Sequence, residues 1–433
     1  MHSSFTTRAR VRRPALAAVA LGLASLAFAV AAQAAQPLTL SEAQALAVAR
    51  SPEVAGFGFA ADAARESAVA AGELPDPMLK VGVENIPADG PDAFSLGRDF
   101  MTMRQVGVMQ ELTRKEKREL RARHSVLEGE KSMAERSLAV ANVERDTALA
   151  WLHLRYAQAM RKVVDEQSAE ARLQVEAADS AYRSGTGSEA DALAARSALA
   201  MLEDRASEID QRIRAAKLAL ARWVGADAER PLSGDAPIDT PPLPETDLRA
   251  HIARHPDLQV AAKEEDIAAN EVKQAVAAKK PDWSVELMYS VRGPAFSNMV
   301  SIGFSVPLQW DRPHRQDREV AAKLALESRA QAEREEMLRM HVAEIGAMLA
   351  EWRTGRERLA RYAKSILPLA RERSAAALAA YRGGKGSLSE ALAARRDELD
   401  ARLSDLNLES ENARTWARLA FLIPESSSMK DMK

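Results

Sequence analysis

Four short segments of this chain alternate between apolar and polar residues. The alternation is clearest from Val300 to Val306, where every second residue is apolar and the residues between are serine or glycine. Similar alternation starts at Leu79 and at Val285, and a weaker one runs over 105–110. A period of two predicts strands with one apolar and one polar face. We place these strands at about 78–86, 103–111, 283–292 and 299–308.

The pattern between these segments predicts long helices. A helix of roughly 35 residues is expected before each strand pair, over Leu40–Glu73 and Asp247–Lys279, and Pro-Asp ends each of them. In the first half, a proline-free helix over Arg114–Arg183 follows, about 105 Å long, and a return helix runs from Ser188 to Trp223. The two shorter helices of a repeat together have about the same length as its longer helix. We therefore expect them to stack end to end beside it, in a rod about 100 Å long.

The chain contains an internal repeat. Residues Ala181–Arg196 match Ala380–Arg395 at eleven of sixteen positions, with an offset of 199 residues. Ala49–Glu53 resembles Ala253–Asp257 in the same way. Self-similarity of this kind indicates two structurally equivalent halves. The expected divisions are a signal peptide at 1–34, a first repeat at 35–230, a Pro-rich linker at 231–246, a second repeat at 247–423 and a flexible tail at 424–433.

The N-terminus is predicted to be a cleaved signal peptide. Four arginines precede an apolar run from Ala15 to Ala31, and Ala32–Ala34 has the A-x-A form of a cleavage site. A retained membrane anchor is the alternative, which the small residues at the end of the run disfavour. No later stretch approaches the about 18–20 apolar residues of a membrane helix. A mature chain that enters a membrane must therefore do so as strands of a closed barrel.

Composition and charge exclude several classes of function. The chain has no cysteine, which excludes disulfides, thiolate metal sites, a cysteine nucleophile and lipidation on cysteine. The formal net charge of −2 gives no reason to expect nucleic acid as a partner. No nucleophile–base arrangement, phosphate-binding loop or HExxH motif occurs. We therefore expect neither an enzyme nor a cofactor.

The sequence indicates no metal site. The histidines at 124, 153, 251, 255, 314 and 341 form no ligand cluster, although His251 and His255 are one turn apart on an expected helix. Met101 and Met103 carry thioethers of the kind that suits Cu(I). Packing of the loop explains these two methionines equally well, so we assign no metal ligand.

The alternating segments are compatible with two structures. One is a half-buried soluble sheet, and the other is a membrane barrel with a wet lumen. A closed barrel needs at least about eight strands, so several copies of this chain would have to share one. Trp283 starts the third strand and Trp310 follows the fourth, which places both at the same end of the sheet. They fit an aromatic belt at the membrane interface, or two buried tryptophans at a helix–sheet junction.

These features together resemble the TolC-like outer-membrane efflux channels. The resemblance rests on the duplicated helix–strand–strand–helix halves and on the paired motifs Tyr182–Arg196 and Tyr381–Arg395, and it covers nearly the whole mature chain. Leu74–Pro87 and Met101–Leu112 are similar to the heavy-metal branch of that family. Channels of that branch serve copper–silver or cobalt–zinc–cadmium pumps of the resistance-nodulation-division type.

The resemblance implies a mainly α fold with a small β part. It implies a homotrimer with a long α-helical periplasmic barrel and a twelve-stranded outer-membrane β-barrel, to which each chain contributes four strands. Such a protein lies in the outer membrane, in contact with its lipid, with a large periplasmic portion and without a lipid on cysteine.

The implied role is that of a passive exit duct in a tripartite efflux system. Its partners would be a periplasmic adaptor (membrane fusion) protein and an inner-membrane resistance-nodulation-division pump, with heavy-metal cations as the cargo. Drug efflux or type I secretion through the same fold is an alternative function. A non-channel periplasmic coiled-coil structural protein is another alternative.

The chain departs from the family pattern at two points. Many relatives carry a lipidated cysteine at the mature N-terminus, which this chain lacks. Where relatives often have a Pro and a Gly after the second strand, this chain has Thr113–Arg118. We therefore expect the long helix of the first half to begin early.

The turns at Ser184–Gly187 and Gly383–Gly386 fall at the far periplasmic tip in this topology. Their glycines suit backbone conformations with positive φ, and the serine that follows each turn stands where a helix N-cap belongs. Turn chemistry alone accounts for these residues, and the resemblance adds that the tips contact the adaptor. The residues assigned to these adaptor-docking tips are Gly185, Gly187, Ser188, Gly384, Gly386 and Ser387.

Asp191 and Glu390 occupy the same position in the two repeats, one turn inside the tip. In a trimer they would supply six carboxylates near the entrance, and such a ring favours cations and can constrict a pore. The alternative is that they are first-turn acids that complement the helix N-terminus. The candidates for holding the tips shut are Tyr182, Arg183, Tyr381 and Arg382, although a solvated helix surface also explains the two arginines.

Overall fold

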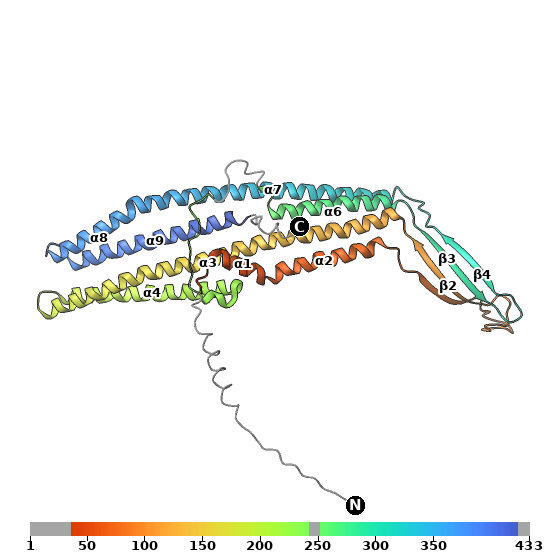
Figure 1. Ribbon diagram of the computed structural model, residues 1–433, viewed down its shortest axis with the longest axis horizontal. Coiled ribbons are helices and arrows are strands. Elements are labelled where there is room, and N and C mark those ends of the chain that lie inside the picture. Colours follow the sequence, from red (N-terminus) through yellow and green to blue (C-terminus); the bar gives the residue numbers. More distant parts are fainter. Residues whose placement is uncertain (1–35, 242–251, 423–433) are drawn as a thin grey trace, which may run out of the picture.

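The computed structural model describes residues 36–241 and 252–422. The predicted signal peptide and C-terminal tail, part of the linker and His251 lie outside the described residues. The chain forms an elongated rod of helices from which a sheet projects at one end (Figure 1). No helix in the described part is long and apolar enough to cross a membrane.

The first repeat runs from the middle of the rod to the sheet, along the whole rod, and back to the middle. Its elements are α1 (Leu40–Arg50), α2 (Pro52–Gly72), β1 (Met78–Glu84), β2 (Met103–Leu112), α3 (Lys115–Arg183), α4 (Glu189–Val224) and the short 3₁₀ helix η1 (Gly225–Glu229).

The second repeat has the same order. Its elements are α6 (Pro256–Ala278), β3 (Trp283–Val291), β4 (Met299–Ser305), α7 (Gln316–Arg361), the π-helical turn η2 (Tyr362–Ile366), α8 (Leu367–Arg382) and α9 (Leu388–Ala420). The π-helical turn ends two residues before Pro368, which has no N–H to donate to the preceding turn.

The predicted fold class is confirmed. Helix α3 has 69 residues, which corresponds to about 100 Å. Helix α2 packs on the half of α3 nearest the sheet, and α4 packs on the other half (Figure 1). The expected end-to-end stacking of two shorter helices beside one long helix is therefore present.

Two helices that were expected to be continuous are each interrupted before a proline. The helix expected over Leu40–Glu73 is broken at Ser51, whose extended backbone and side chain cap α2 through a hydrogen bond from the Val54 N–H. Pro52 follows at the first position of α2, because its missing N–H costs nothing there. In the second repeat the helix expected over Asp247–Lys279 is interrupted in the same way: Ile252 is helical, α6 begins at Pro256, and His255 takes the place of Ser51 as the cap. Asp247 lies outside the described residues.

The four strands form one antiparallel sheet in the order β1-β2-β3-β4. The pairing of β2 with β3 joins the two repeats, with Val106 opposite Tyr289. The loop from 85 to 102 and the β3–β4 turn lie at the end of the sheet away from the helices (Figure 1). The predicted strand at 299–308 ends earlier, at Ser305.

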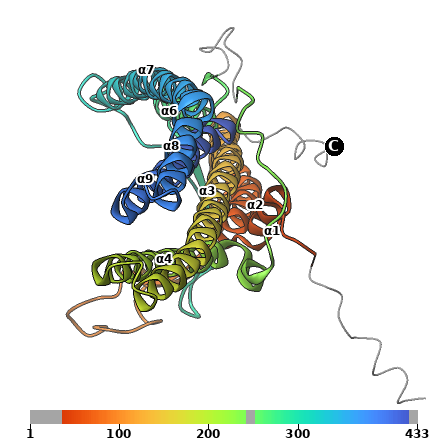
Figure 2. The ribbon, with the colours of Figure 1, turned by 90° about the vertical axis from the view of Figure 1, so that its left-hand side faces the viewer.

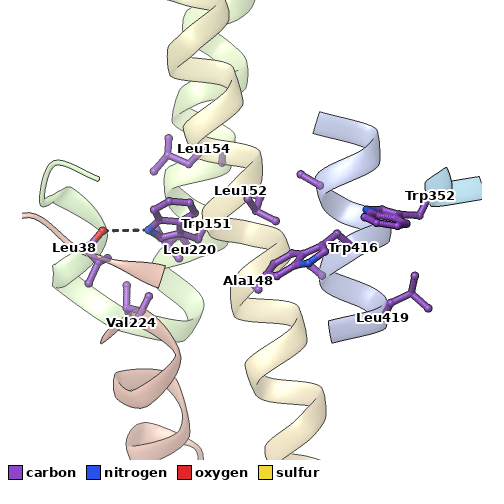
Figure 3. Packing of buried hydrophobic residues seen from close by; sticks show 14 of the residues in the cluster. Leu38, Ala148, Trp151, Leu152, Leu154, Leu220, Val224, Trp352, Trp416 and Leu419 are labelled. Carbon is purple, nitrogen blue, oxygen red and sulfur yellow. Dashed lines mark hydrogen bonds between the residues drawn. The ribbon is translucent and has the colours of Figure 1, made fainter. Parts of the chain in front are cut away.

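The largest buried cluster lies in the middle of the rod, where the repeats and the linker meet. Trp151 of α3 is fully buried, and Trp352 of α7 and Trp416 of α9 are 6% and 5% exposed (Figure 3). Leu38 pairs with Leu232 through a short parallel bridge, so the segment before α1 and the linker are held together on the rod. This cluster lies between the tips of the helical hairpins, at one end of the rod, and the sheet at the other end.

Candidate functional site

The two helical hairpins end together at the pole of the rod opposite the sheet. One hairpin is α3–α4 and the other is α8–α9, and α3 lies between α4 and α9 (Figures 1 and 2). Each turn has a glycine in the left-handed region, Gly185 with φ 76° and Gly384 with φ 69°. The turn chemistry predicted for these two positions is therefore present.

The expectation of positive φ was wrong for the second glycine of each turn. Gly187 and Gly386 are not among the described residues with positive φ. Close approach constrains Gly187 instead, since a Cβ there would lie 2.9 Å from the Cβ of Ala181. The corresponding distance from Gly386 to the Cβ of Ala380 is 3.2 Å, so the second turn is slightly less tight.

Serine side chains cap the return helices as predicted. The Ser188 hydroxyl accepts a hydrogen bond from the Asp191 N–H at 3.1 Å and donates one to the Asp191 carboxylate at 2.6 Å. The Ser387 hydroxyl accepts from the Glu390 N–H at 3.2 Å, and the Glu390 carboxylate accepts from the Ser387 N–H at 3.0 Å, which completes a capping box.

The two acids proposed for the entrance therefore stand at the same position of their helices. The hydrogen bonds from the backbone and side chain of Ser387 lower the pKa of Glu390 below its usual range, so this carboxylate is charged at neutral pH. Glu390 is exposed and Asp191 is partly exposed. Their cap bonds agree with the alternative role as first-turn acids, and the carboxylate ring of a trimer stays a prediction.

The four residues proposed to hold the tips shut have different environments. Tyr381 packs against a small buried cluster that includes Ala178 of α3 and Leu388 of α9. Tyr182 is 48% exposed, and Arg183 and Arg382 are also exposed. Within one chain, Tyr381 is therefore the member of this group that contributes to packing between the hairpins.

Ion pairs between the hairpins are a feature that the sequence did not predict. Arg395 of α9 pairs with Glu170 of α3, and Arg402 pairs with Glu166 one to two turns further along, at 2.9 Å. By contrast, Arg196, the repeat counterpart of Arg395, pairs with Asp179 inside its own hairpin at 2.9 Å. The repeat thus keeps the arginine but uses it for a different contact in each half.

One face of the sheet is apolar, and solvent reaches it in the single chain. The register aligns Val81, Val106, Tyr289 and Val300 across the four strands, and a neighbouring row joins Leu79, Val108, Leu287 and Ile302. Val81 is 75% exposed and Ile302 is 66% exposed. No helix of the described chain packs across this face, so the sheet lacks the covering layer that a soluble sheet has.

The opposite face of the sheet carries polar and charged side chains together with several methionines. Lys80 of β1 pairs with Glu286 of β3 at 2.7 Å, and Gln105 of β2 donates to the Glu84 carboxylate at 2.8 Å. Period-two alternation with apolar and ion-paired faces is the pattern of strands that separate lipid from water.

The junction between the sheet and the rod is tied by one predicted motif. Asp282, the acid of the second Pro-Asp pair, accepts a hydrogen bond from the Arg114 N–H at 3.0 Å and pairs with Lys117 at 2.7 Å. Trp283 and Trp310 both lie near this junction and are 49% and 86% exposed. The alternative of two buried tryptophans therefore does not apply to the single chain, and the role at a membrane interface stays a prediction.

Two of the histidines for which the sequence indicates no ligand cluster lie together in the structure. His255 and His341 lie against each other, with ring centroids 4.5 Å apart, and Asp257 is next to both. Sequence spacing could not reveal this group, because His341 belongs to a different helix. The i,i+4 partner considered before, His251, lies outside the described residues.

Comparisons with known proteins agree with this architecture. Residues 248–424 match the profile of the outer membrane efflux protein family. Among solved structures, the chain is similar to the outer-membrane channel OprN, with a TM-score of 0.73, 18% identity, and coverage of 88% of this chain and 89% of that one.

Two further channels give similar values. The outer membrane protein VceC of Vibrio cholerae has a TM-score of 0.71 and 18% identity over 88% of this chain and 95% of its own. The outer membrane channel CmeC of Campylobacter jejuni has a TM-score of 0.72 and 16% identity over 91% of this chain and 88% of its own. No curated protein sequence matches this chain.

The family match also bears on the chemistry of the chain. A match to efflux proteins agrees with the expectation that the chain is a transport duct and not an enzyme. The chain has the fold of the outer-membrane efflux channels, and its residues 248–424 match the outer membrane efflux protein family.

Proposed function

We propose that this chain is one subunit of a trimeric exit duct in the outer membrane. In this role it receives substrates from an inner-membrane pump through a periplasmic adaptor and lets them leave the cell passively. The observation that carries the proposal is the uncovered apolar face of the four-stranded sheet, together with its ion-paired opposite face. Lipid would cover the first face, and the water of the lumen would cover the second.

The two edges of the sheet support a trimer. In the described part of the chain, β1 and β4 are edge strands whose outer backbone groups have no partner strand. Such edges cannot face lipid, because unpaired N–H and C=O groups cost several kcal/mol each there. Pairing β4 of one copy with β1 of the next removes both edges. Three copies then give a barrel of twelve strands, within the size range of outer-membrane barrels.

The helical rod supports the periplasmic half of the proposal. It extends about 100 Å from the sheet, with the two hairpin tips at its far end. An adaptor would meet these tips, and the pump behind it would supply the energy.

Heavy-metal cations are the cargo that we propose first. Leu74–Pro87 and Met101–Leu112 are similar to the heavy-metal branch, and a ring of Asp191 and Glu390 would favour cations at the entrance. Drug efflux and type I secretion are the alternatives within the same fold. Deleting the gene for this chain and measuring resistance to metals and to drugs separates these cargoes.

A non-channel periplasmic coiled-coil protein is the second candidate function. The sheet argues against it, because a tether needs no apolar face such as the one that contains Val81 and Ile302. Membrane fractionation separates the two candidates: the duct is recovered as heat-modifiable trimers in the outer membrane, whereas recovery as a soluble periplasmic monomer contradicts the proposal.

Two neighbouring substitutions on β4 sharpen this test. Ile302→Lys places a charge on the apolar face, at a cost of about 2–4 kcal/mol if that position is near the middle of the bilayer. Ser301→Lys is the matched control, since it places the same charge on the polar face. We expect the first variant to lose outer-membrane trimers and the second to keep them. Equal yields of trimer from the two variants would contradict the proposed orientation of the sheet.

A further inference from the structure

A group of potential metal ligands lies where the start of α6 packs against α7. His255 caps α6, Asp257 is in its first turn, and His341 comes from the middle of α7. Each of the three residues offers one ligand atom, and these atoms all lie within 4.8 Å of one another. A single ion can therefore be reached by all three with small side-chain rotations.

The His341 side chain has a polar atom that the protein leaves unsatisfied. The residue is 8% exposed, and its Nε2 atom has no hydrogen-bond partner in the described structure. The Asp257 carboxylate is 3.4 Å away, which is within ion-pair distance but without the geometry of a hydrogen bond. A buried, unpartnered nitrogen is uncommon in proteins and requires an explanation.

His255 offers a nitrogen lone pair to this group. The residue is 7% exposed, and its Nδ1 atom accepts a hydrogen bond from the Asp257 N–H at 3.2 Å. That contact is long, so a metal ion competes with a weak helix cap.

We propose that His255, Asp257 and His341 bind a divalent transition-metal ion of the zinc type. Two imidazoles and one carboxylate match the ligand preferences of Zn²⁺, and water would complete a four-coordinate site. The Asp257 side chain is 37% exposed, which provides a path for the ion from solvent.

The bound ion would act as a clamp between two helices. It links the first turn of α6, directly after the segment that connects the repeats, to the middle of α7. Because the ion binds the folded site and not the unfolded chain, it raises the thermal stability of the protein. This role does not depend on the exported cargo or on trimer formation, so it can hold or fail independently of the proposed function.

The competing explanation is an ion pair between a protonated His341 and Asp257. The two explanations predict different results for His341→Leu. A lost ion pair destabilises the protein with and without zinc. A lost ligand abolishes zinc binding, while the metal-free variant keeps or gains stability because an unpaired buried nitrogen has been removed.

The test uses the purified full chain without an affinity tag, titrated with zinc chloride by isothermal calorimetry and thermal melting. We expect one zinc ion per chain and a rise in Tm on saturation. His341→Leu and His255→Asn should each weaken binding by more than about tenfold, since even residues that only support metal ligands contribute this much. Asparagine at 255 keeps an N-cap acceptor, so weaker zinc binding by this variant results from the loss of the imidazole and not from the loss of the helix cap.

His314→Gln is the matched control, because it removes an exposed histidine from another part of the chain. It should bind zinc as the wild type does and show the same rise in Tm. The proposal is overturned if the wild type shows no saturable binding, or if His341→Leu and His255→Asn bind zinc as tightly as the control.

Discussion

Trp151 and Trp352 are counterparts in the two repeats, and each donates its indole N–H to a backbone carbonyl of a segment that crosses the helices. Trp151 donates to Leu38, just before α1, at 3.2 Å, and Trp352 donates to Ile238, in the linker, at 3.3 Å. Buried indole groups usually require such a partner. The same kind of indole hydrogen bond therefore occurs in both repeats, and it holds both non-helical segments on the middle of the rod.

Arginines reinforce both contacts. Arg155 lies over the Trp151 ring, with 5.7 Å between the guanidinium carbon and the ring centroid, and it pairs with Asp235 of the linker. Arg356 lies over the Trp352 ring at 5.6 Å and pairs with Asp239 at 2.7 Å. Each tryptophan thus has an arginine four residues later that reaches the same linker.

We expect Trp151→Phe to lower the stability of the folded chain by about 1–3 kcal/mol. The variant loses a buried hydrogen bond and leaves a small cavity, although the Leu38 carbonyl keeps a second donor in the Ser233 N–H. Trp283→Phe is the control, since that ring is half exposed in the single chain. Thermal melting in detergent measures both variants, and equal Tm values for Trp151→Phe and the wild type would count against the role given to this contact.

The ion pairs between the hairpins lead to a prediction about opening. Arg395→Ala combined with Arg402→Ala removes two links from α9 to α3, each with a partly buried arginine. We expect the second hairpin to detach more easily, which raises the open probability of a reconstituted channel. Single-channel recording measures this probability.

Arg196→Ala is the control for that experiment. It removes the pair with Asp179 but leaves the contacts between the hairpins in place. It should therefore change the open probability less than the double variant does. If the control opens the channel as much as the double variant, the effect comes from general loosening of the tips and not from the contacts between the hairpins.

Glu409 gives a prediction about pH. Burial raises its pKa, and the carboxylates of Asp405 and Asp239 raise it further above the ordinary value of 4.5. At pH values between 4.5 and the raised pKa, the folded chain binds more protons at this position than the unfolded chain does. This contribution therefore destabilises the fold at pH 7 and disappears as the pH falls through the raised pKa towards 4.5.

Glu409→Gln should accordingly raise Tm at pH 7, with a smaller increase near pH 4.5. Glu411→Gln is the control, because that residue is exposed on the same helix. Melting curves at the two pH values provide the measurement. A Glu409→Gln variant that is less stable than the wild type at pH 7 would show that the carboxylate has a partner in the assembled protein.

The entrance acids can be neutralised without removing their caps. Asp191→Asn and Glu390→Gln keep side-chain groups that can accept the cap hydrogen bonds. If six carboxylates line the entrance, the double variant should lose preference for cations, as judged by the reversal potential in a salt gradient. Cation preference and conductance equal to those of the wild type would leave these residues with the capping role alone.

Patterns within a single segment allowed most of the architecture to be predicted. Period-two alternation located β1, β3 and β4, and the repeat located both tip turns because the same glycines and serines recur. The weakly patterned β2 shows its apolar row only through the register, where Val106 and Val108 continue the rows of β1 and β3. The break at Pro52 was missed because the apolar pattern continues across it.

Contacts between distant segments could not be predicted in the same way. Whether Arg395 pairs with its own hairpin or with Glu170 of α3 depends on how the two hairpins pack, and its repeat counterpart Arg196 pairs within its own hairpin. The group formed by His255 and His341 depends in turn on the packing of α6 against α7. Sequence periodicity contains neither relationship.

In the proposed assembly, three copies of this chain form a continuous duct through the outer membrane. Electrical recording of the purified wild-type protein in a planar lipid bilayer tests it most directly. We predict discrete conductance steps from a species that migrates as a trimer when unheated, with no steps from Ile302→Lys and normal steps from Ser301→Lys. Insertion without any conductance, or steps that persist in Ile302→Lys, would contradict the account.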